Sequence, residues 1–145
     1  MTATAPAAPA PVLLDTNVFS KVFVPAQRDA TGQAWATALA GRTVVIAVQT
    51  AVELRAWPLL RSWGLKSTAA LEAQIASVSI IPVNDRVQSA YVDLTVWAKK
   101  NGHGIYAKNH SADRWIAASA MSYALELAST DAIFKGIQGL ARLTL

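Results

Sequence analysis

The stretch VLLDTN at residues 12–17 sets an apolar run directly against three polar residues. A short, uninterrupted run of large aliphatic side chains is typical of a strand that is buried on both faces. The acid and the turn-forming residues after it predict that the strand ends at Leu14 and that a polar turn begins. An acid directly after a buried strand needs a partner for its charge, so Asp15 is the first candidate for a functional residue.

Similar aliphatic or β-branched runs recur along the chain. They predict further strands at residues 44–48, 78–83, 125–128 and 142–144. Between them, apolar residues three to four apart predict helices at residues 18–23, 29–39, 50–63, 68–76, 84–100 and 111–123, with one helical turn at 133–134. Strands that alternate with helices form a mostly parallel sheet with helices on both faces. The sequence therefore predicts a three-layer α/β fold with four to five strands.

Two of the predicted helix starts carry acids. Thr50 is expected to cap its helix with Glu53 three residues later, which is the spacing of a capping box. Pro58 falls inside the same helix and predicts a kink or an early break. Ser111 is expected to cap the helix that carries Asp113, after a polar surface loop.

Four acids occupy places where an α/β sheet collects ligands, at the carboxyl end of a strand or early in the helix that follows. They are Asp15, Glu53, Asp113 and Asp131. Four carboxylates close together repel one another unless cations neutralise them. Mg²⁺ and Mn²⁺ prefer oxygen ligands, and two such ions can activate a water and stabilise the leaving oxygen in phosphodiester cleavage. The pattern therefore predicts a metal-dependent nuclease that needs neither His nor Cys.

Each acid also has a purely structural interpretation. The helix dipole alone stabilises an acid in a first turn, which would account for Glu53 and Asp113, and Asp131 could be an ordinary turn residue. Asp15 is the hardest to explain in this way, because burying its charge is costly. His110 could contact phosphate or transfer a proton, but nothing marks it as half of a metal-ligand pair, so we interpret it as an exposed polar residue.

The composition favours a polyanionic substrate and a protein partner. Hydrophobic residues make up 53% of the chain and charged residues 15%, so part of the surface is expected to be covered in an oligomer. The 13 Lys and Arg exceed the nine Asp and Glu, and binding of cations by the four acids would leave a basic surround that suits phosphates. Lys108 and Arg114, at the loop before the third acid, are candidate RNA contacts. Trp57 and Trp63 mark a candidate partner surface.

The chain has no cysteine, which excludes disulfides and thiolate metal sites and makes the cytoplasm the expected compartment. Residues 1–10 are rich in Ala and Pro and have neither a basic segment nor a long apolar core. We expect them to form a flexible tail rather than a signal peptide or a membrane span. The length fits one domain, expected at residues 11–145.

Four stretches together resemble the acidic motifs of PIN-domain proteins. They are VLLDTNVFS, TAVEL, NHSADRWIAASA and ASTDAIFKGIQGL, in the order of that family and at similar spacings, and the resemblance covers essentially residues 11–145. The chain is most similar to the VapC toxins of bacterial toxin–antitoxin pairs, which are small single-domain ribonucleases.

The resemblance implies a PIN-like fold and a role for each motif. The four acids would be metal ligands and catalytic residues, Asn17 would help to order the turn after the first acid, and Ser129 would support the site. It also implies Mg²⁺ or Mn²⁺ as the cofactor, structured RNA such as tRNA or ribosomal RNA as the substrate, a homodimer, a cognate VapB antitoxin and no membrane association.

Two rival interpretations remain. A phosphatase of the haloacid dehalogenase type also begins with an aspartate after its first strand, but it needs a second aspartate two residues on, where this chain has Asn17. The alternative is a non-catalytic PIN-like RNA-binding module, in which the acids only hold a metal or cap helices. The complete set of four acids argues against that module.

Overall fold

A computed structural model of the protein describes residues 10–145, apart from the side chain of Ala26. The expected Ala/Pro-rich tail therefore lies outside the described residues, except for Ala10. The expectation that residues 11–145 form one domain stays a prediction.

The centre of the fold is a parallel sheet in the strand order β3-β2-β1-β4-β5. The strands are β1 (Val12–Leu14), β2 (Val44–Ala47), β3 (Ser79–Ile81), β4 (Glu126–Ala128) and β5 (Arg142–Leu143). This confirms the predicted parallel α/β sheet. The order runs outward from β1 to β3 on one side and continues with β4 and β5 on the other, so the carboxyl ends of β1 and β4 form the switch point where such sheets bind ligands.

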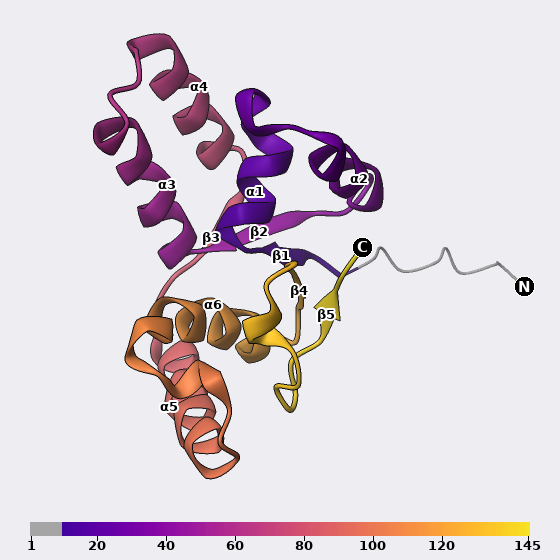
Figure 1. The fold of residues 1–145 in the computed structure, drawn as a ribbon, viewed down its shortest axis with the longest axis vertical. Helices are drawn as coiled ribbons and strands as arrows, with labels where there is room; N and C mark the ends of the chain where they lie inside the picture. Colours follow the sequence, from indigo (N-terminus) through magenta and orange to yellow (C-terminus); the bar gives the residue numbers. More distant parts are fainter. Residues whose placement is uncertain (1–9) are drawn as a thin grey trace, which may run out of the picture.

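Helices cover both faces of the sheet, as the alternation of elements predicts (Figure 1). They are α1 (Thr16–Phe23), α2 (Ala30–Ala38), α3 (Val48–Leu60), α4 (Leu65–Ala76), α5 (Asp85–Lys100) and α6 (Ser111–Ser122). The first four lie on one face, and α5 and α6 lie on the other. Short 3₁₀ turns are η1 (Pro25–Gln27), η2 (Gly104–Tyr106), η3 (Lys108–His110) and η4 (Ala132–Phe134).

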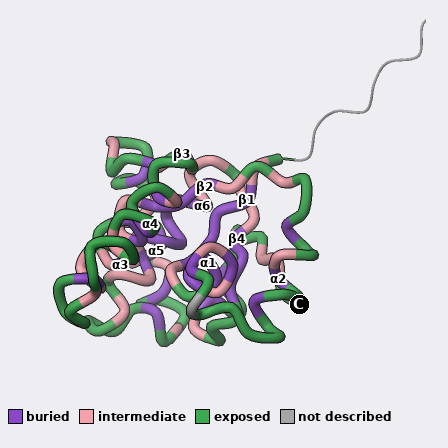
Figure 2. The backbone as a smooth tube through the Cα atoms, turned by 90° about the horizontal axis from the view of Figure 1, so that it is seen from above, coloured by how far each residue is buried: buried purple, intermediate pink, exposed green. Residues whose placement is uncertain are grey.

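Successive residues of β1 point to opposite faces of the sheet, so this strand contributes to two separate hydrophobic cores. Leu14 packs in a cluster with Phe19 and Trp35 from the first helices. Leu13 packs in a second cluster with Leu94 of α5, among other residues of that face. All five side chains are at most 2% exposed. Figure 2 shows the result as buried backbone at β1, β4 and α1 in the middle of the molecule, with much more exposed backbone on α3 and α4.

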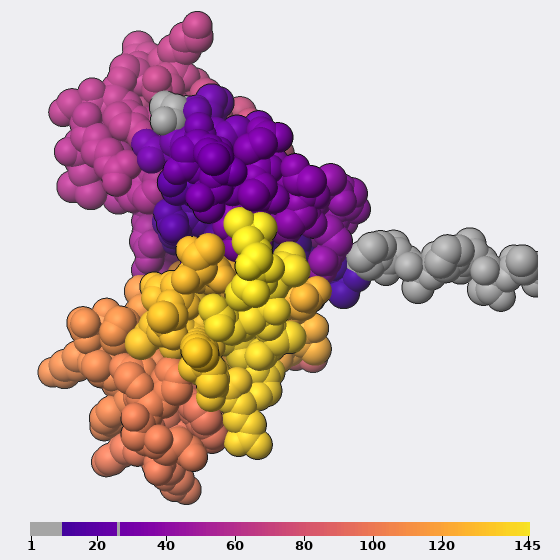
Figure 3. Space-filling view, turned by 45° about the vertical axis from the view of Figure 1, so that its right-hand side comes forward, coloured from indigo at the N-terminus to yellow at the C-terminus, as the bar shows by residue number. Residues whose placement is uncertain are grey.

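The end of the chain returns to the sheet beside its beginning. Strand β5, at one of the predicted strand positions, is an edge strand and pairs with β4. In Figure 3 the yellow C-terminal residues lie against both the indigo N-terminal part and the orange helices.

The structure corrects two predicted helix starts. Helix α3 begins at Val48, directly after β2, so Thr50 does not cap it and Glu53 lies in its second turn. The capping-box explanation of Glu53 is therefore wrong, because the chain enters the helix earlier than the polar residue suggests. Ser111 is the first residue of α6 rather than its cap, and His110 precedes it. The predicted loop before α6 contains the turns η2 and η3.

Helix α3 ends at Leu60, a little before the predicted end near Trp63. Pro58 lies inside the helix and is buried, and the helix continues for only two residues beyond it. Ser62 adopts a left-handed conformation, with φ of 52°, where the chain reverses toward α4. Within residues 10–145, no helix combines the length and the apolar character that crossing a bilayer requires.

Candidate active site

Asp15 lies at the switch point of the sheet, where β1 ends. Its backbone N–H donates to the carbonyl of Ala128 at the end of β4 (3.2 Å), so the two strands stay paired up to this residue. The side chain caps α1, because Oδ1 accepts the N–H of Val18 at 2.8 Å. A helix therefore begins immediately after Asp15, where the sequence predicted a polar turn. Asp15 is 6% exposed, which makes it a buried acid.

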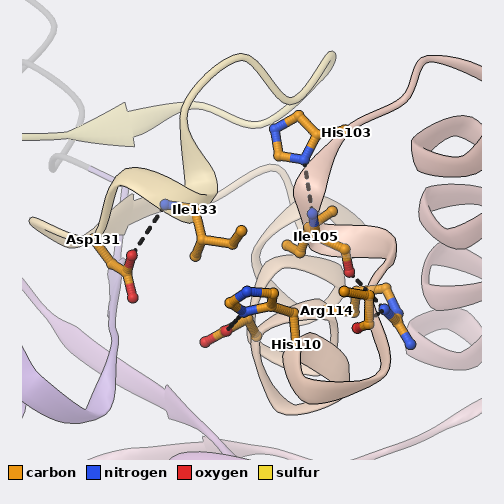
Figure 4. A network of polar contacts seen from close by, with 8 residues as sticks. His103, Ile105, His110, Arg114, Asp131 and Ile133 are labelled. Carbon is orange, nitrogen blue, oxygen red and sulfur yellow. Dashed lines mark hydrogen bonds and ion pairs between the residues drawn. The ribbon is translucent and has the colours of Figure 1, made fainter.

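Ser129 joins the first acid to the fourth. Its hydroxyl donates a short hydrogen bond to Asp15 Oδ2 and accepts the backbone N–H of Asp131 at 3.0 Å. Ser129 is fully buried, so this contact is shielded from water. Asp131 itself is exposed and caps the turn η4, with Oδ1 accepting the N–H of Ile133 at 3.0 Å. Figure 4 shows this acid and its bond to Ile133.

The pKa of the Asp15 carboxyl is raised above its ordinary value of 3.8. Burial is the largest cause, since it penalises the charged form, and the nearby charges of Asp131 and Asp113 act in the same direction. The hydrogen bonds from Ser129 and Val18 oppose this shift but do not cancel it. The surroundings of Asp15 therefore favour a proton or a cation on this carboxyl group.

Glu53 is held in place by a residue that the sequence analysis missed. Thr16 donates its hydroxyl to Glu53 Oε2 at 2.7 Å, and its Oγ1 lies 3.2 Å from that of the fully buried Thr50. The second oxygen of Glu53 accepts from Gln49 at 3.2 Å. Thr16, the first residue of α1, thus connects α1 with α3, the helix of the second acid. The only signal for it was its place directly after the first acid.

The third acid is paired with a histidine that we had interpreted as an exposed polar residue. Asp113 is in the first turn of α6, and its Oδ2 lies 2.7 Å from Nδ1 of His110. Figure 4 shows the His110 ring beside the start of α6. The contact is part of the candidate site, because Asp113 also acts electrostatically on Asp15.

Arg114 faces inward, in contrast to the RNA-contact position expected from the sequence. It is 7% exposed. Its Nη1 donates to the carbonyls of Ile105 at 2.5 Å and Ala107 at 3.0 Å. Its Nε and Nη2 lie 3.2 Å and 3.1 Å from the hydroxyl of Tyr91. The side chain therefore anchors η2 and the loop before α6 to α5. A basic residue beside a basic loop gives no sequence signal for such burial.

The two remaining candidates are on the surface. Asn17 is exposed in the first turn of α1, and its backbone carbonyl accepts from Ser20 at 2.9 Å. Lys108 is exposed on η3, five residues before Asp113.

The residues present fit a divalent cation that keeps part of its water shell. Among residues 10–145, no three Asp, Glu or His side chains stand close enough to hold one ion by themselves. Mg²⁺ usually takes one or two carboxylates and retains several waters, so it does not need a closed protein cage. The donors here are carboxylates, and the pKa of Asp15 is raised, mainly by burial and in smaller part by the charges of Asp131 and Asp113, so protein groups do not fully compensate the charge of this carboxylate.

The fold and this site define a class: a three-layer α/β protein with acids gathered at the switch point of a parallel sheet. The sequence profile of the PIN domain matches residues 12–140. The chain belongs to the PIN-domain family. PIN domains are nucleases, and they generally use divalent metal ions.

Solved structures with the same fold include a member of the VapBC family of toxin–antitoxin systems. FitAcB from Neisseria gonorrhoeae is 28% identical, with a TM-score of 0.68 over 91% of this chain and 96% of that one. VapBC-5 from Mycobacterium tuberculosis is 24% identical, with a TM-score of 0.63 over 94% and 100%. VapBC2 from Rickettsia felis, bound to a DNA fragment from its promoter, is 19% identical, with a TM-score of 0.76 over 92% and 97%. No curated protein matches the sequence.

Proposed function

We propose that this protein is a Mg²⁺- or Mn²⁺-dependent endoribonuclease and acts as the toxin of a VapBC-type pair. The observation that carries the proposal is the buried acid Asp15 at the switch point of the sheet, which Ser129 joins by hydrogen bonds to the backbone of Asp131 and which lies near enough to Asp113 to feel its charge. The relation to FitAcB and the VapBC complexes supports the toxin assignment. The cytoplasm, where structured RNAs such as tRNA and ribosomal RNA are found, is the proposed compartment.

In the proposed reaction, one or two of the carboxylates of Asp15, Glu53, Asp113 and Asp131 would hold the cation directly, and the others would bind the waters that it retains. The bound cation supplies a more acidic water and neutralises charge that develops on the phosphate. Ser129 keeps Asp15 and Asp131 side by side, and Thr16 keeps Glu53 turned toward the start of α1. Lys108 is placed to contact the RNA backbone at the rim.

Purified protein is expected to cleave structured RNA in Mg²⁺ or Mn²⁺ and to stop when EDTA removes the metal. Expression without a partner is expected to halt growth. Asp113→Asn removes one negative ligand oxygen while keeping the size of the side chain, so this variant is expected to lose both effects. The measurement is gel analysis of total tRNA and ribosomal RNA, together with growth curves after induction.

Exposed Asp93→Asn on α5 serves as the matched control in both assays, because it makes the same change from acid to amide at a residue outside the four acids. Cleavage that persists in EDTA, or an Asp113→Asn variant that is as toxic as the original chain, would contradict the assignment. Metal-independent RNA binding without cleavage would instead support the non-catalytic binding module.

We also propose that the antitoxin covers the apolar surface of α3 and α4. Leu59, Leu60 and Leu65 are 85%, 79% and 92% exposed, which is unusual for three leucines so close in sequence. Beside them, a cavity of about 470 Å³ opens between the end of α1 and α4, with Phe23, Trp63 and Leu71 among its lining residues. Trp63 therefore lies at the surface predicted for a partner, and an amphipathic antitoxin segment suits it.

Leu60→Glu is expected to weaken antitoxin binding about 30-fold, the effect of losing about 2 kcal/mol at an interface hot spot. Because Leu60 is exposed, the melting temperature of the isolated protein should stay the same. Calorimetric titration of each variant with separately purified antitoxin measures the dissociation constant. Val92→Glu, at an exposed position on α5 on the other face, is the control. If Val92→Glu weakens binding as much as Leu60→Glu, the partner surface is not on α3 and α4.

A further inference from the structure

The residue before α6 brings a histidine ring to the third acid of the site. His110 Nδ1 lies 2.7 Å from Asp113 Oδ2 (Figure 4). A carboxylate oxygen accepts hydrogen bonds, so Nδ1 is the donor in this pair. The side chains of His110 and Asp113 are 29% and 27% exposed, which places the contact at the rim of the site rather than in open solvent. A hydrogen bond to a charged oxygen in such a place is stronger than one between neutral groups.

The position of His110 is set by the network that buries Arg114. The backbone N–H of His110 donates to the carbonyl of Ala107 at 2.9 Å, and that same carbonyl accepts from Arg114 at 3.0 Å. Arg114 also holds the carbonyl of Ile105. The backbone that presents the imidazole is therefore anchored before any ligand arrives. A donor that is held in advance loses little freedom when it makes its contact.

Asp113 has a competing orientation that this donor opposes. It is the third residue of α6, where an acid can turn toward the free N–H groups of the first helical turn. The terminal torsion of an aspartate is broad, so the backbone alone does not decide the plane of the carboxylate. The hydrogen bond from His110 Nδ1 to Asp113 Oδ2 fixes the plane of the carboxylate and leaves Oδ1 free for a second partner.

We propose that His110 is a positioning residue, which orients the Asp113 carboxylate for the cation and acts only through Asp113. This inference rests on the proposed function, because it takes Asp113 as a cation ligand. Partners that orient a metal ligand in this way typically contribute 10- to 100-fold to metal affinity or activity. We therefore expect loss of the donor to weaken cation binding about tenfold.

The test is Mn²⁺ affinity, measured on the metal-free full chain from the electron paramagnetic resonance signal of free Mn²⁺. His110→Asn and His110→Leu are a matched pair: they have the same branched shape, but only the asparagine carries a nitrogen donor where Nδ1 stood. His110→Leu, and His110→Ala as a second variant without the donor, are expected to bind Mn²⁺ about tenfold more weakly. His110→Asn should stay within about twofold of the original chain, since the donor is kept. Exposed Asn109→Ala is the neighbouring control.

Three results would overturn the role of His110. Affinity could be unchanged in the leucine and alanine variants, or the asparagine variant could lose as much as the leucine variant. The asparagine variant could also bind Mn²⁺ normally but fail to cleave RNA, which would place the ring on the substrate.

Asp113→Asn separates this inference from the proposed function. If that variant binds Mn²⁺ like the original chain, Asp113 is not a ligand and the proposed site itself fails. If it loses Mn²⁺ while His110→Leu does not, the proposed site stands and only the role of His110 is wrong.

Discussion

Replacing Asp15 by asparagine is expected to abolish RNA cleavage and at the same time to raise the melting temperature of the metal-free protein at neutral pH. Cleavage is lost because the neutral amide no longer contributes a charged oxygen to the proposed cation site. The fold is retained, because the remaining oxygen can still accept the N–H of Val18 and cap α1. Asp15→Ala would remove that cap at a cost of about 1 kcal/mol, so asparagine is the cleaner test.

The gain in stability follows from the raised pKa of Asp15. A carboxyl whose pKa is higher in the folded protein binds its proton more tightly there than in the unfolded chain, so stability falls as the pH rises from about 3.8 through the folded pKa. The penalty is complete once the pH exceeds the folded pKa, and the asparagine removes it. Each kcal/mol corresponds to roughly 2–4 °C for a chain near this size.

Thermal melts between pH 4 and pH 8, with and without Mg²⁺, measure this effect beside the cleavage assay. The difference in melting temperature between the asparagine variant and the original chain should shrink toward pH 4, where a larger fraction of Asp15 is protonated. Mg²⁺ should raise the melting temperature of the original chain and leave the variant nearly unchanged. If the variant melts lower than the original chain at every pH, the burial penalty on Asp15 is not what the raised pKa indicates.

Replacing Arg114 by methionine is expected to lower the free energy of unfolding by about 2–4 kcal/mol, because the buried carbonyl of Ile105 and the hydroxyl of Tyr91 lose their donors. Methionine keeps the apolar volume, so the loss reports hydrogen bonds rather than a cavity. The stacking of Tyr91 on Trp115, with ring centroids 3.9 Å apart, is expected to loosen with them. Equilibrium unfolding in urea, followed by tryptophan fluorescence, measures the change.

Arg86→Met is the matched control for Arg114. Its guanidinium also lies over an aromatic ring, 4.8 Å from the centroid of Tyr123, but the residue is exposed. An exposed cation–π contact contributes about 0.5–1 kcal/mol, so this variant should stay close to the original stability. Equal losses in the two arginine variants would mean that Arg114 contributes through its charge over Tyr91 and not through the carbonyls it binds.

The sequence predicted the fold well because the fold depends on local and repeated signals. The aliphatic run before Asp15 and the alternation of strands with helices were sufficient for a parallel sheet covered on both faces. Helix starts were less predictable. Thr50 has the composition of a cap, but in the structure it is buried beside Thr16, a partner 34 residues away. The capping preference of threonine is a local property, so it does not take into account a contact with a residue that is distant in the sequence.

The roles of the side chains around the acids were harder to predict, because they depend on contacts that the fold creates. Arg114 and His110 have ordinary sequence contexts, a basic residue in a helix and a histidine in a loop. Arg114 is buried because Tyr91, 23 residues earlier, comes to it from α5. His110 meets Asp113 because η3 leads directly into α6 at the rim of the site. Neither role follows from residue type alone.

By itself, the sequence determined that an acid stands at the end of a buried strand, since residues 12–15 carry both signals side by side. Only the tertiary structure decided what surrounds that acid. Asp15 and Ser129 are 114 residues apart in the chain, and they touch because β4 pairs directly with β1. The order of the strands depends on how the helices pack on both faces of the sheet. That order brings residues distant in the sequence into contact, which no local sequence pattern encodes.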